Sequence, residues 1–270
     1  TNVFRNFSLK KMSNSPKKLS AVSLFSGAGG LDLGFHQTGS IESIACYEHN
    51  DTFAETLRNN LSRLTESSID RMPYISMQDL SEEPVIEELN NRWKGADIVF
   101  GGPPCQSFSI MGKTLNGEKL GVKDGRGSLI YSFVKVVQGL APRAFLFENV
   151  PNIKNVEDGR IVNELETLFQ EAGYKLWSGV LSASDFGAYT FRKRFFIIGF
   201  KGSGSVPAPS PTHSEVEQFD IFYGQLEKWR ACGELFEEIE QKTGKTESEV
   251  IKIMRRSLKP SSFRLWRKRV

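Results

Sequence analysis

The sequence predicts an α/β protein built on a doubly wound, mostly parallel sheet. Short apolar runs alternate with helix-like segments between residues 21 and 200, a pattern typical of strands joined by crossover helices. Glycines stand where the first apolar run meets its helix. Polar or acidic residues directly follow several of the runs, at the edge where such sheets bind ligands.

Composition indicates a soluble globular protein. The 270 residues are 39% hydrophobic and 25% charged, and no apolar run approaches the ~18 residues that suggest a membrane span. The N-terminal stretch has lysines but lacks the apolar core of a secretory signal. Cys46, Cys105 and Cys232 stand far apart, which predicts neither a disulfide framework nor a metal cluster. We therefore expect a cytoplasmic protein that binds no metal.

Both ends of the chain are basic, although its net charge is only +3. Residues 1–20 carry five Lys or Arg and residues 252–270 carry eight, with no acid in either stretch. Basic ends around a near-neutral core favour a polyanionic partner. We expect a basic arm at 1–20, a main domain at 21–200, a Pro- and Gly-rich linker at 201–214, and a mainly helical region at 215–270 that contacts the polyanion or a partner chain.

The first strand, expected at 21–25, ends in a glycine-rich turn at 26–30 that leads into a helix. A second strand at 41–47 ends at Glu48, 21 residues after Gly27. A carboxylate at about this offset reaches ribose hydroxyls in nucleotide-binding α/β folds. The pair therefore predicts an adenosine-containing cofactor. Asp79, after another short strand, either contacts an adenine amino group or caps the next helix.

The stretch 96–109 organises the rest of the chain. Its apolar run ends in two glycines, and two prolines then stiffen the backbone in front of Cys105. Most free cysteines are small buried hydrophobes. A cysteine held just beyond a strand is instead well placed as a nucleophile, because little entropy is lost in positioning it. The Gly- and Lys-rich segment 111–127 that follows is predicted to be a lid.

Later elements place further charged and polar side chains at the same edge of the predicted sheet. The strand at 144–147 ends in Glu148 and Asn149, and Arg192 and Arg194 lead into the strand at 195–200. The remaining elements expected before residue 200 are helices at 52–64, 128–140 and 162–172 and strands at 74–77 and 174–181.

Taken in order, these motifs resemble the cytosine-5 DNA methyltransferase family over residues 22–200. The resemblance rests on the glycine-rich turn, two acids, the Pro-Pro-Cys-Gln loop, the Glu-Asn-Val triplet and an Arg-x-Arg. The matching residues are Phe25 to Gly30, Glu48, Asp79, Gly102 to Ser109, Gly127 to Leu129, Glu148 to Val150 and Arg192 to Arg194.

The resemblance implies a Rossmann-like catalytic domain at 21–200 that uses S-adenosylmethionine, releases S-adenosylhomocysteine and acts on double-stranded DNA. It implies cofactor contacts from Phe25, Ser26, Gly27, Ala28, Gly29, Gly30, Glu48, Asp79, Pro104 and Leu129. It further implies catalysis by Cys105, Glu148, Arg192 and Arg194, and substrate contacts from Gln106, Ser109 and Asn149.

The chemistry follows from the weak nucleophilicity of cytosine C5. Attack of the Cys105 thiolate on C6 makes C5 electron-rich, and Glu148 is expected to hydrogen-bond or protonate N3. Arg192 and Arg194 are candidates to stabilise the base oxygen and the backbone. Because C6 must be attacked from the face of the ring, the cytosine has to flip out of the duplex. Gln106 and Ser109 would then fill the gap.

Two departures from the family pattern stand out. Ala188 to Phe191 replace the usual Pro-Gln before the Arg-x-Arg, and neither the N-terminal arm nor the region after residue 214 has the family's Gly-Asn-Ser-Val element. The chain is therefore expected to be a fragment or, as we favour, one subunit of a split enzyme whose partner supplies the missing parts.

We expect the modification enzyme of a bacterial-type restriction system. The alternatives are an RNA (tRNA) cytosine-5 methyltransferase and a catalytically silent DNA-binding relative. A nicotinamide-dependent oxidoreductase fits least, because the turn at 26–30 lacks the full glycine spacing.

Overall fold

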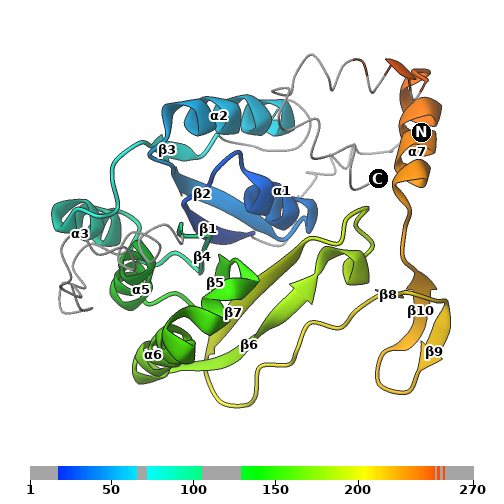
Figure 1. Cartoon of the computed structure of the whole chain (residues 1–270). Coiled ribbons are helices and arrows are strands. Elements are labelled where there is room, and N and C mark those ends of the chain that lie inside the picture. Colours follow the sequence, from blue (N-terminus) through cyan, green and yellow to red (C-terminus); the bar gives the residue numbers. More distant parts are fainter. Residues whose placement is uncertain (1–17, 66–71, 105–128, 247, 250–251, 253–270) are drawn as a thin grey trace, which may run out of the picture.

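A seven-stranded sheet forms the centre of the molecule (Figure 1). The structure, a computed structural model, describes residues 18–65, 72–104, 129–246, 248–249 and 252. The strands are β1 (Leu19–Leu24), β2 (Ile41–Tyr47), β3 (Tyr74–Ser76), β4 (Ile98–Gly101), β5 (Ala144–Asn149), β6 (Tyr174–Ser182) and β7 (Lys193–Lys201). They lie in the order β3-β2-β1-β4-β5-β7-β6.

Most neighbouring strands are parallel, which confirms the predicted fold class. Parallel pairs join β1 to β2 and β4, β2 to β3, and β4 to β5. Strand β7 lies between β5 and β6 and runs antiparallel to both. The beginning of β7 therefore lies at the same edge of the sheet as the carboxyl ends of β1, β2, β4 and β5.

Helices lie on both faces of the sheet (Figure 1). The side chains of α1 and α2 pack on one face, and those of α3, α5 and α6 pack on the other. Their bounds are α1 (Gly30–Gln37), α2 (Asp51–Thr65), α3 (Glu83–Arg92), α5 (Leu129–Leu140) and α6 (Arg160–Glu171). Short 3₁₀ segments at Pro151–Gly159 and Ala183–Phe186 follow β5 and β6.

The main core lies between the sheet and the second group of helices. Apolar residues of α5 recur every three or four positions, as an amphipathic helix requires. The ring of Phe133 meets those of Phe145, Phe147 and Phe169 edge to face, with centroids 5.4–6.3 Å apart. This packing holds β5 against α5 and α6, and the parallel pairing of β5 with β4 fixes the relative positions of the residues that follow these two strands.

The chain beyond β7 differs from the prediction. Residues 202–212 form no regular element, in keeping with a linker. A small sheet then follows, with the order β8-β10-β9. Its strands are β8 (His213–Ser214), β9 (Gln218–Asp220) and β10 (Gly224–Lys228), and they are followed by helix α7 (Cys232–Thr243). The prediction of a mainly helical region from residue 215 was therefore wrong up to residue 231, because strands this short show no readable alternation.

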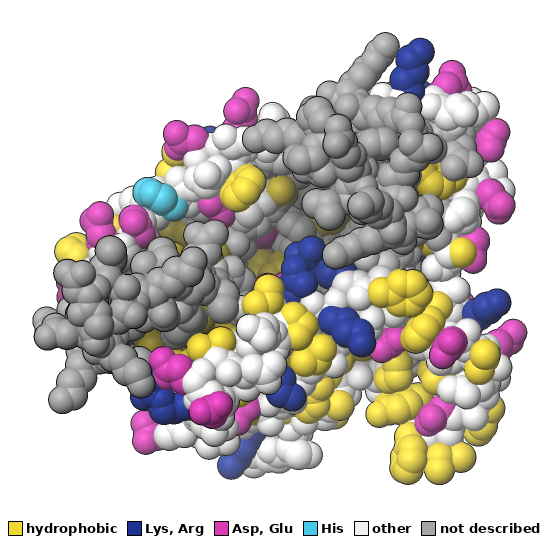
Figure 2. Space-filling model, viewed as in Figure 1, with side chains coloured by type: hydrophobic (Ala, Val, Ile, Leu, Met, Phe, Trp, Pro, Cys, Tyr) yellow, Lys and Arg dark blue, Asp and Glu magenta, His cyan; other side chains and the backbone are white. Residues whose placement is uncertain are grey.

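Strand β9 and the turn that joins it to β10 expose large apolar side chains. Phe219 is 73% exposed, and Ile221 and Phe222 are each 83% exposed. Hydrophobic side chains gather over this small sheet at the lower right of Figure 2. The turn is therefore an apolar surface that stands apart from the main core. None of the described helices is long and apolar enough to span a membrane.

Candidate active site

The turn between β1 and α1 adopts left-handed backbone at several positions. Phe25, Gly27 and Gly29 have φ values of 54°, 55° and 86°. A Cβ added to Gly29 would lie 2.7 Å from Cδ1 of Leu57, whereas one added to Gly27 would meet no atom of the described residues within 4 Å. Gly29 is thus required for packing against α2, and Gly27 borders open space.

Glu48 lies against this turn, as the 21-residue spacing predicted. Its Oε2 accepts the Gly27 N–H at 2.8 Å, and its Oε1 accepts the Asn50 N–H at 2.8 Å. Its own N–H donates to the Ser76 carbonyl at 2.9 Å. A carboxylate offers about four acceptor positions, so the group retains capacity for further donors. The proximity of turn and carboxylate is confirmed.

Asp79 begins the turn that leads into α3. Its Oδ1 accepts the Ser81 N–H at 2.8 Å, and its carbonyl accepts the Glu82 N–H at 3.2 Å. The backbone hydrogen bond from Ser81 lowers the pKa of the Asp79 carboxyl. These contacts form a turn ahead of α3, whose N-cap residue is Glu82, so the alternative that Asp79 caps this helix was wrong. The proposed contact with adenine stays a prediction.

The loop after β4 is tied to the end of β5. The Asn149 amide donates to the Pro103 carbonyl at 3.0 Å, and the Val150 N–H donates to the Asn149 side-chain oxygen at 2.9 Å. Asn149 is only 3% exposed. Its observed partners are therefore parts of the protein, and its predicted substrate contact stays a prediction. Pro104 is exposed where the described part of this loop ends.

A carboxylate and a guanidinium meet beside this loop. The Arg194 Nε lies 2.8 Å from Glu148 Oε1, and each side chain is 23% exposed. A Cβ on Gly102 would lie 2.7 Å from Glu148 Oε2, so the absence of a side chain there leaves room for the acid. The pair is thus partly buried yet open to a ligand. Arg192, two residues before Arg194, is exposed at the same edge.

The sequence-predicted groups are only partly described by the structure. Cys105, Gln106 and Ser109 lie outside the described residues. Leu129 begins α5 and packs, half-buried, against the main core; its predicted place in the cofactor pocket stays a prediction. Among the described residues, no group of three or more His, Cys, Asp or Glu side chains could hold a metal ion.

One contact at the glycine turn was missed by the sequence analysis. The Asn60 amide, on α2, donates to the Ala28 carbonyl at 2.8 Å and so holds the outer part of the turn. No motif marks Asn60, because its role depends on the packing of α2 beside the turn. Gly102 was quoted within a motif, but its spatial role beside Glu148 required the register of β4 and β5.

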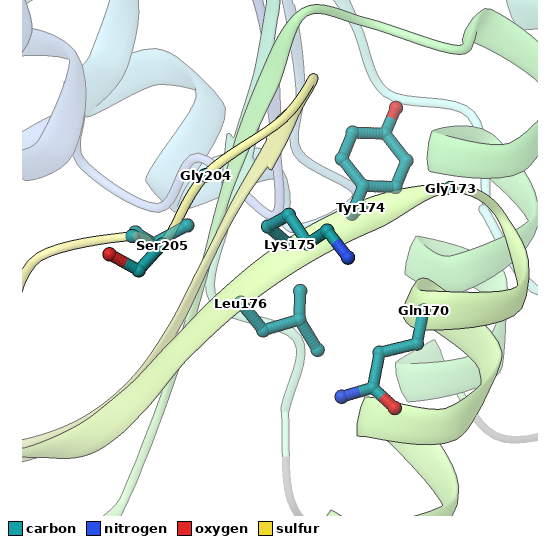
Figure 3. Close-up of a pocket in the computed structure, with 8 residues that line it drawn as sticks. Gln170, Gly173, Tyr174, Lys175, Leu176, Gly204 and Ser205 are labelled. Atoms are coloured by element: carbon teal, nitrogen blue, oxygen red, sulfur yellow. The ribbon is translucent and has the colours of Figure 1, made fainter.

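A cavity of about 470 Å³ lies away from this edge (Figure 3). Its lining includes Gln170 of α6, Tyr174 and Lys175 at the start of β6, and Gly204. Tyr174 pairs with Lys201 at the end of β7. The cavity is therefore at the opposite edge of the sheet from Glu148, and none of the predicted site residues lines it.

Comparisons with known proteins agree with the motifs. Residues 19–262 match the family described as C-5 cytosine-specific DNA methylase. Type II methyltransferase M.AquIA of Picosynechococcus is 36% identical over 227 residues, which cover 79% of this chain and 85% of that protein. Type II methyltransferase M1.HphI of Haemophilus parahaemolyticus is 33% identical over 213 residues, which cover 79% of this chain but 54% of that protein.

Solved structures show the same fold. A DNA modification methyltransferase encoded within an E. coli prophage has a TM-score of 0.53 at 30% identity, covering 68% of this chain and 47% of that one. Spodoptera frugiperda DNMT2 has a TM-score of 0.51 at 21% identity, covering 68% and 50%. The chain thus spans about half the length of several proteins that it matches. By its sequence and its fold, this chain belongs to the family of C-5 cytosine-specific DNA methylases.

Proposed function

We propose that the chain transfers a methyl group from S-adenosylmethionine to C5 of a cytosine flipped out of duplex DNA. It would act in the cytoplasm as the modification enzyme of a restriction system. The observation that carries the proposal is the placement of Glu148 and Arg194 beside the loop that leads into Cys105, at the same edge of the sheet as Glu48.

The residues of the glycine turn fit an adenosine ligand. The Glu48 carboxylate is oriented by two backbone N–H groups and keeps acceptor positions for ribose hydroxyls. No atom of the described residues lies within 4 Å of a Cβ built on Gly27, which leaves the room that a closely approaching ligand requires. When bound here, S-adenosylmethionine would supply an electrophilic methyl group.

The reaction on the base begins with a covalent bond. The Cys105 thiolate adds to C6, and the electron pair released from the C5–C6 double bond passes through the ring toward N3. Glu148 donates a proton to N3, or shares one in a hydrogen bond, and Arg194 holds the Glu148 carboxyl in place. Once C5 carries the methyl group, its proton passes to water, Cys105 leaves C6 as the thiolate, and the N3 proton returns to Glu148, which restores the aromatic ring.

Trapping on a fluorinated base tests this mechanism. A duplex containing 5-fluorocytosine, incubated with the protein and cofactor, is expected to give a covalent adduct on a denaturing gel, because fluorine cannot leave C5 as the proton does. Cys105→Ser should give none. An adduct with tRNA and none with duplex DNA would support the RNA alternative and overturn the DNA assignment.

We also propose that a second polypeptide supplies the Gly-Asn-Ser-Val element and the region that recognises the target sequence. A cavity of about 340 Å³ on the α1 side of the sheet supports this assignment, because Leu146, Ile198 and Phe200 line it and Phe200 is 49% exposed. The sheets of doubly wound folds are normally covered on both faces. This apolar surface is therefore suited to a helix from the partner.

Charged substitution tests where the partner binds. Phe200→Asp should abolish co-purification with a polypeptide that carries the missing element. The matched control is Phe219→Asp, which changes an exposed phenylalanine on the small sheet and should retain the complex. Methylation at full rate by the purified chain alone would overturn the two-chain proposal.

A further inference from the structure

A buried carboxylate lies directly beneath the glycine turn. Asp32, in the first turn of α1, is 2% exposed. An ionised carboxylate at such a depth is costly unless hydrogen bonds satisfy it. Its Oδ1 accepts the Ser43 hydroxyl at 2.6 Å and the Cys46 thiol at 3.4 Å, and its Oδ2 accepts the Ser23 hydroxyl at 2.9 Å.

These donors come from two strands. Ser23 belongs to β1, whereas Ser43 and Cys46 belong to β2. Asp32 therefore joins α1 to both strands that carry the predicted cofactor residues. Burial is the largest influence on its carboxyl and raises its pKa, while the hydrogen bonds from Ser43, Ser23 and Cys46 act in the opposite direction. The Ser43, Cys46 and Ser23 groups all donate to the carboxyl oxygens, so the carboxyl group is the shared acceptor of these contacts.

The hydrogen bonds continue from Asp32 to the turn. The hydroxyls of Ser23 and Ser26 lie 2.8 Å apart. Because the Ser23 proton points to Asp32, Ser26 donates in this contact. Ser26 is also held by its N–H, which donates to the Tyr47 carbonyl at 3.1 Å, and by its own carbonyl, which accepts the Gly29 N–H at 2.9 Å. The next residue, Gly27, donates its N–H to Glu48.

We propose that Asp32 is a positioning residue for the adenosyl cofactor, acting through Ser23 and Ser26 to fix the Gly27 N–H against Glu48. This inference rests on the proposed function, since it assumes that the turn and Glu48 bind the cofactor. Asp32 itself is too deeply buried to contact a ligand. Its removal should therefore weaken cofactor binding while the chemistry on the base continues.

Asp32→Asn is the direct test. The amide keeps the shape but places an N–H₂ group against donors, so the turn loses its fixed orientation. S-adenosylhomocysteine affinity, measured by calorimetric titration, should fall roughly tenfold, as expected for the loss of one buried hydrogen-bonded contact. The KM for S-adenosylmethionine should rise by a similar factor. The kcat at saturating cofactor and the KM for DNA should stay within about twofold, a split that general loss of folded protein would not produce.

Asp97→Asn is the matched control. Asp97 also links strands by hydrogen bonds, because its Oδ2 accepts the N–H and the hydroxyl of Ser20 at 3.0 Å each. It precedes β4 and so lies at the opposite edge of the sheet from the glycine turn. This variant should leave S-adenosylhomocysteine affinity unchanged. An equal loss in both variants would overturn the inference.

Two serine variants extend the test if Asp32→Asn fails to fold. Ser43→Ala removes one donor to the carboxylate and should weaken S-adenosylhomocysteine binding by a smaller factor. Ser26→Ala should weaken it too. Where Asp32→Asn does fold, its combination with Ser26→Ala should bind no worse than the weaker-binding single variant, because both act through one chain of contacts. Wild-type protein that binds no S-adenosylhomocysteine, either alone or in complex with the polypeptide that carries the missing element, would overturn the proposed function. If the wild type binds S-adenosylhomocysteine and the Asp32→Asn and Ser43→Ala variants bind it equally well, this inference is overturned while the proposed function stands.

Discussion

Glu48 and Glu148 hold corresponding places in two halves of the sheet, yet they are held differently. Each acid lies at the carboxyl end of a parallel strand, Glu48 just after β2 and Glu148 in β5. Two backbone N–H groups hold Glu48, both within a few residues of a strand end. A side-chain cation, Arg194 from the antiparallel strand β7, holds Glu148.

The difference matches the task proposed for each acid. Backbone donors cannot leave when a ligand arrives, so Glu48 is a fixed acceptor suited to binding. An arginine side chain can move to another acceptor, so the Glu148 carboxyl can share a proton with a base and return to its partner. Substitutions at Glu148 should therefore affect rate, and those at Glu48 should affect affinity.

Glu148→Gln is expected to have the largest effect. Removing the proton donor should lower kcat by about 10²- to 10⁴-fold, the usual contribution of a general acid. S-adenosylhomocysteine affinity, measured by calorimetry, should not change. Glu87→Gln, on the exposed surface of α3, is the control. Weakened cofactor binding in Glu148→Gln would remove the distinction between the two acids.

Arg194→Ala should come next, with kcat lowered roughly 100-fold, as for the loss of one preorganised donor. Arg192→Ala should have a smaller effect, because Arg192 is exposed and the structure gives it no contact with Glu148. Methyl transfer to duplex DNA under saturating cofactor measures both. Equal losses would show that Arg194 acts on DNA charge and not through Glu148.

Glu48→Gln should weaken S-adenosylhomocysteine roughly tenfold, because one amide oxygen cannot replace a carboxylate held by the Gly27 and Asn50 N–H groups. The kcat at saturating cofactor should remain close to that of the wild type. A large fall in kcat with unchanged affinity would reverse the roles assigned to the two acids.

Gly29→Ala probes the turn on which Glu48 depends. An alanine at position 29 would have to adopt left-handed backbone and would place its Cβ 2.7 Å from Cδ1 of Leu57. Together these should lower the free energy of unfolding by at least about 1–2 kcal/mol. Gly30→Ala is a close control, since a Cβ there would meet nothing within 4 Å in the part of the chain that the structure describes, and its φ is not positive. Urea unfolding measures both variants. Equal stability of the two would show that the turn can rearrange.

Asp97→Asn should have the smallest effect of these substitutions. It should appear in the pH dependence of the free energy of unfolding. A backbone hydrogen bond from Ser20 is the main reason that its pKa lies below the ordinary value. A lowered pKa in the folded state stabilises the fold above the unfolded pKa, and that contribution disappears as pH falls through the folded value. The unfolding free energies of wild type and Asp97→Asn should therefore differ at neutral pH, and the difference should shrink as the pH falls below the ordinary pKa of an aspartic acid. A constant difference would exclude this linkage.

The sequence predicted local relations better than long-range ones. The spacing of Gly27 and Glu48 was enough to predict that they lie close together, because a helix, a turn and a strand of ordinary length join them. The contact between Glu148 and Arg194 was expected only as a shared edge, since it depends on β7 entering antiparallel beside β5. The buried contacts of Asp32 were not predicted, because its hydrogen-bond donors lie on two strands and follow no motif. The small sheet was missed because β8 is two residues long and β9 three.

The apolar turn between β9 and β10 has a consequence for the behaviour of the protein in solution. Phe219, Ile221 and Phe222 each offer most of their surface to water, and adjacent exposed apolar side chains promote contact between copies. Concentrated samples of the lone chain should therefore self-associate, more strongly as salt rises and charge repulsion is screened. Sedimentation of the wild type and of Phe222→Ser would compare their self-association. A smaller fraction of oligomers in Phe222→Ser would show that this turn mediates the contact between copies.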